Sequence, residues 1–178
     1  MIIYDIIGYL SVILSVISFL EKDKTKMRIF GIFAGLAFGI NIYGYGGYNG
    51  VFVSVISILG KVLAIKFGED KLFFLKAISL PLALGFFFLF NSEGISGLLP
   101  ALILVIVIFA DTQKDIIKMK YIYIFSTTVW LIYSIVIWSV PGIVCDAVAI
   151  MALIYSILLM KGYSLSIPSY NLNKLFRV

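Results

Sequence analysis

Residues 17–28, ISFLEKDKTKMR, end one apolar segment and follow it at once with four basic residues. The apolar segment itself, residues 3–20, is close to the about 20 residues that cross a bilayer core of about 30 Å. All 14 Lys and Arg residues of the chain fall near the ends of the first, third, fifth and seventh of seven such segments. The connections at Gly44–Gly50, Asn91–Ser96 and Ser139–Pro141 carry none. Because basic loops stay cytoplasmic, this alternation predicts an outer N-terminus and an inner C-terminus.

The composition agrees with a membrane protein. Hydrophobic residues make up 62% of the 178 residues and charged residues 13%, and the mean hydropathy is +1.13. A soluble domain is about half apolar and about a quarter charged. The net charge of +5 is dispersed over the cytoplasmic segments, where it sets orientation and meets anionic lipid headgroups. We therefore expect the lipid bilayer, and no nucleic acid, as a partner.

The hydropathy pattern predicts an all-α membrane protein with seven transmembrane helices. The expected spans are residues 3–20, 28–46, 47–67, 72–90, 95–110, 119–138 and 140–160. Helices are expected because lipid cannot satisfy open backbone groups, and no period-2 pattern of a barrel is present. After Lys161 the chain becomes polar, so residues 161–178 are expected to form a cytoplasmic tail.

An internal repeat organises these spans. Phe19–Glu21 aligns with Phe109–Asp111 at an offset of 90, and Gly50–Val51 aligns with Gly142–Ile143 at an offset of 92. Because each triplet holds an odd number of spans, a single inverting helix must separate two copies of the same orientation. The pattern predicts two parallel three-helix bundles, residues 1–67 and 95–160, joined by the linker helix 72–90. Two like bundles around a shared axis leave a cavity near mid-membrane, as in many transporters.

Four stretches carry a resemblance to a known family: Ile17–Lys24, Phe38–Gly44, Val129–Tyr133 and Ser139–Asp146. They resemble the YgjV-type bacterial inner-membrane proteins, over residues 8–161. The three-plus-one-plus-three layout is in turn similar to that of the SWEET and SemiSWEET sugar transporters. The resemblance implies a multi-pass protein of the bacterial inner membrane.

The resemblance to the transporters also implies a substrate site. Those proteins grip their substrate with a polar residue on the third helix of each repeat and with residues of the second helices. By position, Ser54 and Asp146 would be the third-helix pair, and Asn41 and Trp130 would come from the second helices. The chain departs from that pattern at Ser18 and Ile108, where the transporters have a proline near the inner end of the first helix of each repeat. Asn41 replaces a histidine of the YgjV-type pattern.

Asp146 is the strongest candidate on physical grounds. It lies six residues into the seventh segment, about 9 Å below the outer surface at 1.5 Å per residue. An ionised carboxylate there costs several kcal/mol unless it is hydrated, paired or protonated, so an intramembrane acid is a candidate for function. Desolvation favours its protonated form, which would suit proton coupling. The alternative is a carboxyl that only holds helices together.

Hydroxyl and aromatic side chains complete the candidate site. Ser54 and Ser57 share one face of the third segment, and Tyr133 belongs to a polar stripe on the sixth. Such hydroxyls also bridge helices, which is their commoner role in membranes. Trp130 lies mid-span, where interfacial anchoring does not explain it, whereas Trp138 is expected to be an outer anchor. Lys61, the deepest basic residue, is expected to snorkel to the cytoplasmic surface.

Catalysis is poorly supported. The chain has no His, which removes the Ser–His and Cys–His pairs and the imidazole metal ligands, and no cofactor or metal is expected. We expect a small-solute transporter, facilitative or proton-coupled, for a small polar solute such as a sugar. The alternative is a non-transporting scaffold or accessory subunit, and an intramembrane enzyme is the weakest candidate.

Overall fold

The computed structural model describes residues 2–69, 78, 81–85, 87–88 and 93–163, and every secondary-structure element within these residues is helical. Six α-helices and one short 3-10 helix, η2, are defined over the described part of the chain. Their bounds are α1 Ile2–Leu20, α2 Lys24–Gly44, α3 Tyr48–Phe67, η2 Gly94–Gly97, α5 Leu98–Asp111, α6 Ile116–Val136 and α7 Val140–Met160.

Six of the seven predicted spans are confirmed as helices. Each is long and apolar enough to cross a membrane, with η2 and α5 together forming the span Gly94–Asp111. Two helices begin earlier than predicted, α2 at Lys24 and α6 at Ile116. The cause is an aspartate N-cap at each start: the Asp23 carboxylate accepts from Lys26 N and the Asp115 carboxylate from Ile117 N, both at 2.8 Å. These caps start the helices within charged segments that the hydropathy-based prediction left outside the spans.

The predicted linker helix and tail fall mostly outside the described residues. Of the expected span 72–90, residues 78, 81–85 and 87–88 are described, and they are helical. Ala83 and Phe87 belong to the apolar cluster that includes much of α5. The tail, residues 164–178, lies outside the described residues.

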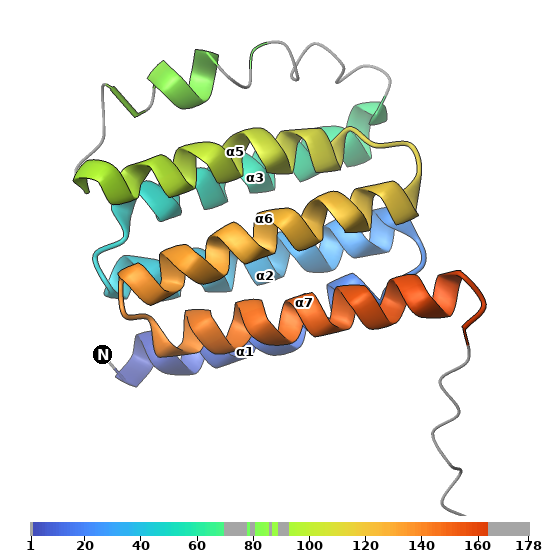
Figure 1. The fold of residues 1–178 in the computed structure, drawn as a ribbon, viewed down its shortest axis with the longest axis horizontal. Coiled ribbons are helices and arrows are strands. Elements are labelled where there is room, and N and C mark those ends of the chain that lie inside the picture. The colour runs from blue at the N-terminus through green and yellow to red at the C-terminus, as the bar shows by residue number, and fades with distance from the viewer. Residues whose placement is uncertain (1, 70–77, 79–80, 86, 89–92, 164–178) are drawn as a thin grey trace, which may run out of the picture.

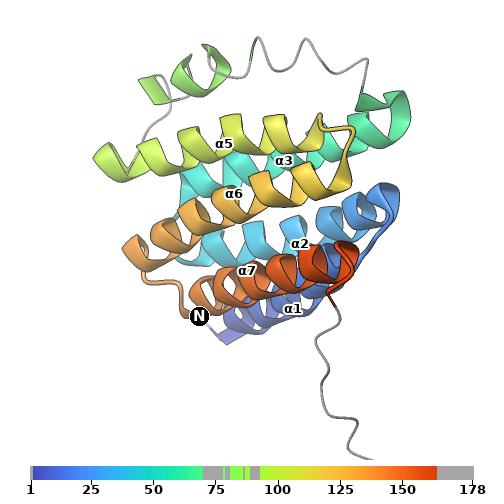
Figure 2. The same cartoon turned by 45° about the vertical axis from the view of Figure 1, so that its right-hand side comes forward.

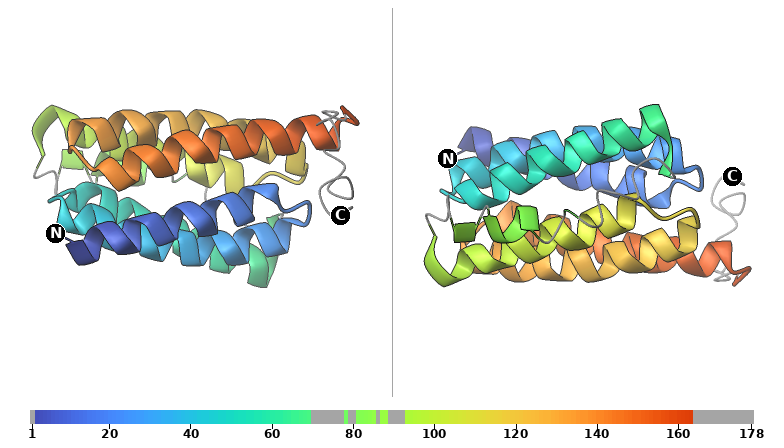
Figure 3. Two further views of the ribbon diagram at one scale, coloured as in Figure 1. Left: turned by 90° about the horizontal axis from the view of Figure 1, so that it is seen from below. Right: turned by 90° about the horizontal axis from the view of Figure 1, so that it is seen from above.

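The six long helices form two layers of three. In Figure 1, α5, α6 and α7 lie in front of α3, α2 and α1 respectively, and the two views of Figure 3 show the layers one above the other. Contacts join α1 to α2, α2 to α3, α3 to α5, α5 to α6, α6 to α7 and α7 back to α1. Figure 2 shows the same order from an oblique direction. The helices thus form a closed ring, with α2 and α6 in the middle of their layers.

The two ends of the bundle differ in chemistry. At one end lie the short turns between α2 and α3 and between α6 and α7, which we call the turn end. At the other lie the α1–α2 and α5–α6 connections, which carry Lys22 and Lys114, and we call it the basic end. Gly46 at the α2–α3 turn has φ 78°, and Trp138 at the α6–α7 turn has φ 57°. Both turns therefore need a left-handed residue, but only the first uses glycine.

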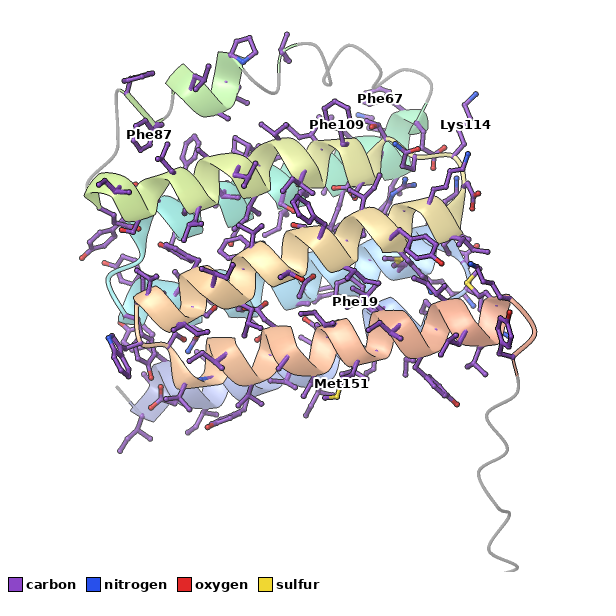
Figure 4. All side chains as sticks on the ribbon, viewed as in Figure 1. Phe19, Phe67, Phe87, Phe109, Lys114 and Met151 are labelled. Carbon is purple, nitrogen blue, oxygen red and sulfur yellow. The ribbon has the colours of Figure 1, made fainter. Side chains whose placement is uncertain are left out.

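The exterior of the bundle is apolar. Large hydrophobic side chains are exposed on every long helix; Met151 of α7, labelled in Figure 4, projects away from the bundle and is 60% exposed. Polar side chains are instead buried inside, among them Ser11, Ser54, Lys61, Lys120 and Asp146. A surface that is apolar around a partly polar interior suits a chain surrounded by lipid, where polar groups must find partners inside.

Candidate functional site

A cavity of about 110 Å³ lies between the two layers. All six long helices contribute to its wall, for example through Ser15, Phe38, Ser54, Val107 and Trp130. Its polar lining comes from hydroxyls, two basic residues and one carboxylate: Ser15, Ser18, Ser54, Ser57, Tyr123, Ser126, Thr127, Arg28, Lys61 and Asp146. The volume is enough for several water molecules or a small solute.

Four lining residues lie at one depth near the turn end. Phe38, Ser54, Trp130 and Asp146 are each six residues from the turn end of their helices, α2, α3, α6 and α7. Six residues correspond to about 9 Å along a helix. We call this set the Asp146 layer. The Phe38 and Trp130 rings meet within it, with centroids 5.1 Å apart and planes at 89°.

Asp146 is buried, with 4% of its surface exposed. Its Oδ2 accepts a hydrogen bond of 2.9 Å from Ser134 Oγ on α6. Within the described part of the chain no Lys or Arg lies within ion-pair distance of it. The carboxyl therefore has one hydroxyl partner and faces the cavity without a compensating charge.

Of the six predicted site residues, Ser54, Ser57, Trp130 and Asp146 line the cavity, whereas Asn41 and Tyr133 are not among its lining residues. Asn41 accepts from Ser139 Oγ at 2.8 Å and donates to the Tyr4 carbonyl at 3.0 Å. It thereby ties α2 to α1 and to the N-cap of α7 at the turn end.

Tyr133, on α6 of the other layer, also forms hydrogen bonds at the turn end. Its hydroxyl donates to Glu93 Oε2 at 2.9 Å and accepts from Gly50 N at 3.3 Å. Gly47 and Gly50 are needed there, because a Cβ at either position would approach the Tyr133 hydroxyl oxygen or ring to 2.7 Å. Asn41 and Tyr133 both link the two layers at the turn end.

The basic end carries a charged cluster that sequence reasoning missed. Lys61 does not snorkel: it is 8% exposed, its Nζ donates to Ser57 Oγ at 2.6 Å, and it lies 3.5 Å from Asp111 Oδ2. Asp111 Oδ1 accepts from Tyr123 OH at 2.5 Å. Arg28 is also buried, and its Nη2 donates to the Asp111 carbonyl at 2.8 Å. This cluster joins α2 and α3 of one layer to α5 and α6 of the other.

Outside the spans, Glu69 completes this cluster. It pairs with Lys24 Nζ at 2.9 Å and with Arg28 Nη1 at 2.8 Å. Burial by itself would raise the pKa of Glu69, but the hydrogen bonds from Lys24 and Arg28 outweigh it and lower the pKa from 4.5 to about 2. Lys24, at the start of α2, also donates to the Lys114 carbonyl at 2.7 Å, which ties α2 to the α5–α6 connection.

Lys120, on α6, connects its own layer to the end of α1 in the other layer. It is fully buried, and its Nζ donates to the carbonyls of Phe19 and Glu21 at 2.9 and 2.7 Å and to Ser156 Oγ at 2.5 Å. These contacts were not predictable from the sequence, in which Arg28 and Lys120 share only their position four residues into a capped helix.

Two buried polar atoms of the cavity wall have no hydrogen-bond partner among the described residues: Arg28 Nε and Ser126 Oγ. A buried N–H or hydroxyl without a partner costs about 1–3 kcal/mol. Because both residues line the cavity, water or a solute inside it can supply the missing partners.

Six apolar helices around a cavity with a few polar groups in its wall define a multi-pass membrane protein. Residues 2–163 match the family model Imp-YgjV, described as bacterial inner membrane protein. This match covers most of the chain, so the protein belongs to that family of bacterial inner membrane proteins. The predicted YgjV-type resemblance and the multi-pass inner-membrane location are confirmed. The comparisons with curated proteins and with solved structures each gave no match.

Proposed function

We propose that the protein is a small-solute transporter, facilitative or proton-coupled, whose solute binds in the cavity between the two helix layers. The observation that carries this proposal is the Asp146 layer, which places a carboxyl, a hydroxyl and two aromatic rings around one buried cavity. Apolar walls with a few convergent polar groups are typical of ligand sites. Ser57 lines the same cavity toward the basic end.

An internal duplication, with a three-plus-one-plus-three layout, is part of this proposal. An offset of 92 relates the N-caps Asp23 and Asp115, the left-handed residues Gly46 and Trp138, and the cavity residues Ser54 and Asp146. The same offset maps α1, α2 and α3 onto α5, α6 and α7. The contact between α1 and α2 then corresponds to the contact between α5 and α6, and the contact between α3 and α5 corresponds to the contact between α7 and α1. Both features support two copies related by an approximate two-fold axis through the cavity.

The contacts at the two ends support a transport cycle. Asn41 and Tyr133 link the layers at the turn end, and Arg28, Lys61 and Lys120 link them at the basic end. In an alternating-access cycle one set would open while the other stays closed. We propose that the basic end is cytoplasmic, because Lys and Arg residues gather there and are missing from the opposite connections.

The test begins with a ligand screen on the purified protein. A solute that binds the folded state raises its thermal midpoint, and solutes found in this way are then tested for uptake into proteoliposomes. Asp146→Asn keeps the shape and the Ser134 hydrogen bond but removes the titrating group. We expect it to fold and to lose solute binding or the pH dependence of uptake.

The alternative is a scaffold or accessory subunit without transport, and the Ser134–Asp146 hydrogen bond between α6 and α7 favours it. In a scaffold, Asp146→Ala and Ser134→Ala would both destabilise the protein, because each removes the interhelical bond. Unfolding of Asp146→Ala together with full uptake by Asp146→Asn would assign the carboxyl to structure and contradict the site proposed above.

A further inference from the structure

The charges around the cavity do not balance within its wall. Of the three charged lining residues, Arg28 pairs with Glu69 at 2.8 Å and Lys61 lies 3.5 Å from Asp111. Both cations thus have their own carboxylates at the basic end. Asp146 is the exception, since over the described residues its polar contact is the Ser134 hydroxyl. When ionised, this carboxylate leaves the cavity with one uncompensated negative charge.

If the carboxyl is ionised, its counter-charge has to come from a bound cation, because neither basic residue of the cavity wall pairs with Asp146. Lys61 lies 13 residues from the turn end of α3, about 10 Å deeper along the helix axis than the Asp146 layer. Lys120 is buried among three oxygen acceptors and is not a lining residue. An unpaired buried carboxylate is strongly destabilising, and a cation bound beside it would remove that cost.

The neighbours of Asp146 in its layer suit one kind of cation. The Trp130 and Phe38 rings lie at the same depth and pack edge to face at 5.1 Å. An ammonium group over an aromatic face is attracted to the ring electrostatically, most strongly when the site is desolvated. Ser54 supplies a hydroxyl at that depth, which can hydrogen-bond to a polar group elsewhere on the cation, such as a hydroxyl. A bare metal ion would instead seek several oxygen ligands, and the layer has few.

We infer that the Asp146 layer binds the ammonium group of a small organic cation, with the Asp146 carboxylate as counter-charge and the Trp130 and Phe38 rings as its apolar wall. This inference rests on the proposed function in that it names the class of solute carried through the cavity. Neutral sugars, which the layout of the helices suggested, would leave the carboxylate without its counter-charge.

The experiment compares choline with 3,3-dimethyl-1-butanol, which has the same shape but a carbon in place of the charged nitrogen. Equilibrium binding to the purified wild-type protein is measured first, and uptake into proteoliposomes second. We expect choline to bind at least about tenfold more tightly than the alcohol, as a cation–π contact plus an ion pair implies. Equal binding of the two compounds, or binding of neutral sugars alone, would overturn the inference. Choline binding without uptake would support this inference and contradict the transport proposal.

Variants locate the site. Asp146→Asn should weaken choline binding at least about tenfold and leave any binding of the alcohol unchanged. Trp130→Leu should also weaken choline binding, and Trp130→Phe should restore part of it, because an aromatic face is kept. Met151→Leu, on the lipid-facing side of α7, is the matched control and should bind choline as the wild type does. If Asp146→Asn binds choline normally, the carboxylate is not the counter-charge and the inference fails. The wild-type comparison of the two compounds decides the matter even if a variant does not fold.

Discussion

The buried pair of Lys61 and Asp111 offers the sharpest test of the packing between the layers. Lys61→Met keeps the length of the side chain that passes Gly31, but it leaves the Asp111 carboxylate without its cation. Asp111→Asn keeps the shape of the side chain and an oxygen to accept from Tyr123. Each variant thus removes one charge with little change in volume.

The structure sets the size of the effect. Removing one partner of a buried ion pair costs about 3–5 kcal/mol. The distance of 3.5 Å is longer than that of a charge-assisted hydrogen bond, and Asp111 retains its Tyr123 partner. We therefore expect a cost at or just below the bottom of that range, about 2–3 kcal/mol, for Lys61→Met. Asp111→Asn should cost less, about 1–2 kcal/mol, because Lys61 keeps its hydrogen bond to Ser57.

The assay is a double-mutant cycle on the free energy of unfolding in detergent. The double variant removes both charges at once, so it should lose at least about 1 kcal/mol less than the sum of the two single variants. For a chain of this size, 1 kcal/mol corresponds to about 2–4 °C in the thermal midpoint. If the two single effects add within about 0.5 kcal/mol, the charges do not interact across the layers, and the account of the basic end is wrong.

Three further predictions concern the ends of the bundle. The pKa of Glu69 is lowered to about 2, so its ion pairs should contribute stability above about pH 4.5 and lose it as the pH falls toward 2. Thermal midpoints measured over this range should show a steeper decline in the wild type than in Glu69→Gln. Gly46 has φ 78° and open space around it, so Gly46→Ala should lower the free energy of unfolding by about 1 kcal/mol through backbone strain alone. Trp138→Gly should relieve a similar strain at the other turn. Free energies of unfolding that move in the opposite directions would contradict this. In a Cys145→Ala background, an impermeant thiol reagent added to sealed cells should label a cysteine at position 46 but not one at position 114, and labelling at 114 would refute the proposed orientation.

Much of the helical framework could be predicted from the sequence, because lipid imposes a length and an apolar character on every span. Six spans were found with errors of a few residues, and the larger errors came from Asp23 and Asp115, whose caps begin α2 and α6 within charged segments. The placement of Asp146 and Ser54 at one depth also followed from the sequence. Both residues lie at the same distance after a short turn, and helical rise is constant.

The rotation of each helix was decided only by tertiary packing. In a soluble protein a polar face and an apolar face show which side of a helix is buried. In a membrane the lipid is as apolar as the interior, so the pattern carries little of that information. Asn41 and Trp130 were therefore equal candidates by sequence, yet Trp130 lines the cavity while Asn41 bonds to Ser139 and Tyr4.

The contacts of the cluster at the basic end were also decided by packing and not by the sequence pattern. Lys61, Arg28 and Asp111 are recognisable in the sequence as charges near helix ends, where each was free to face the membrane surface. Arg28 meets the Asp111 carbonyl across 83 residues of chain, and Lys61 meets the Asp111 carboxylate from another helix. The sequence by itself determined the membrane class and six of the spans through local hydropathy. Only the packing of the two layers decided which charges turn inward to pair, because that depends on which distant helices become neighbours.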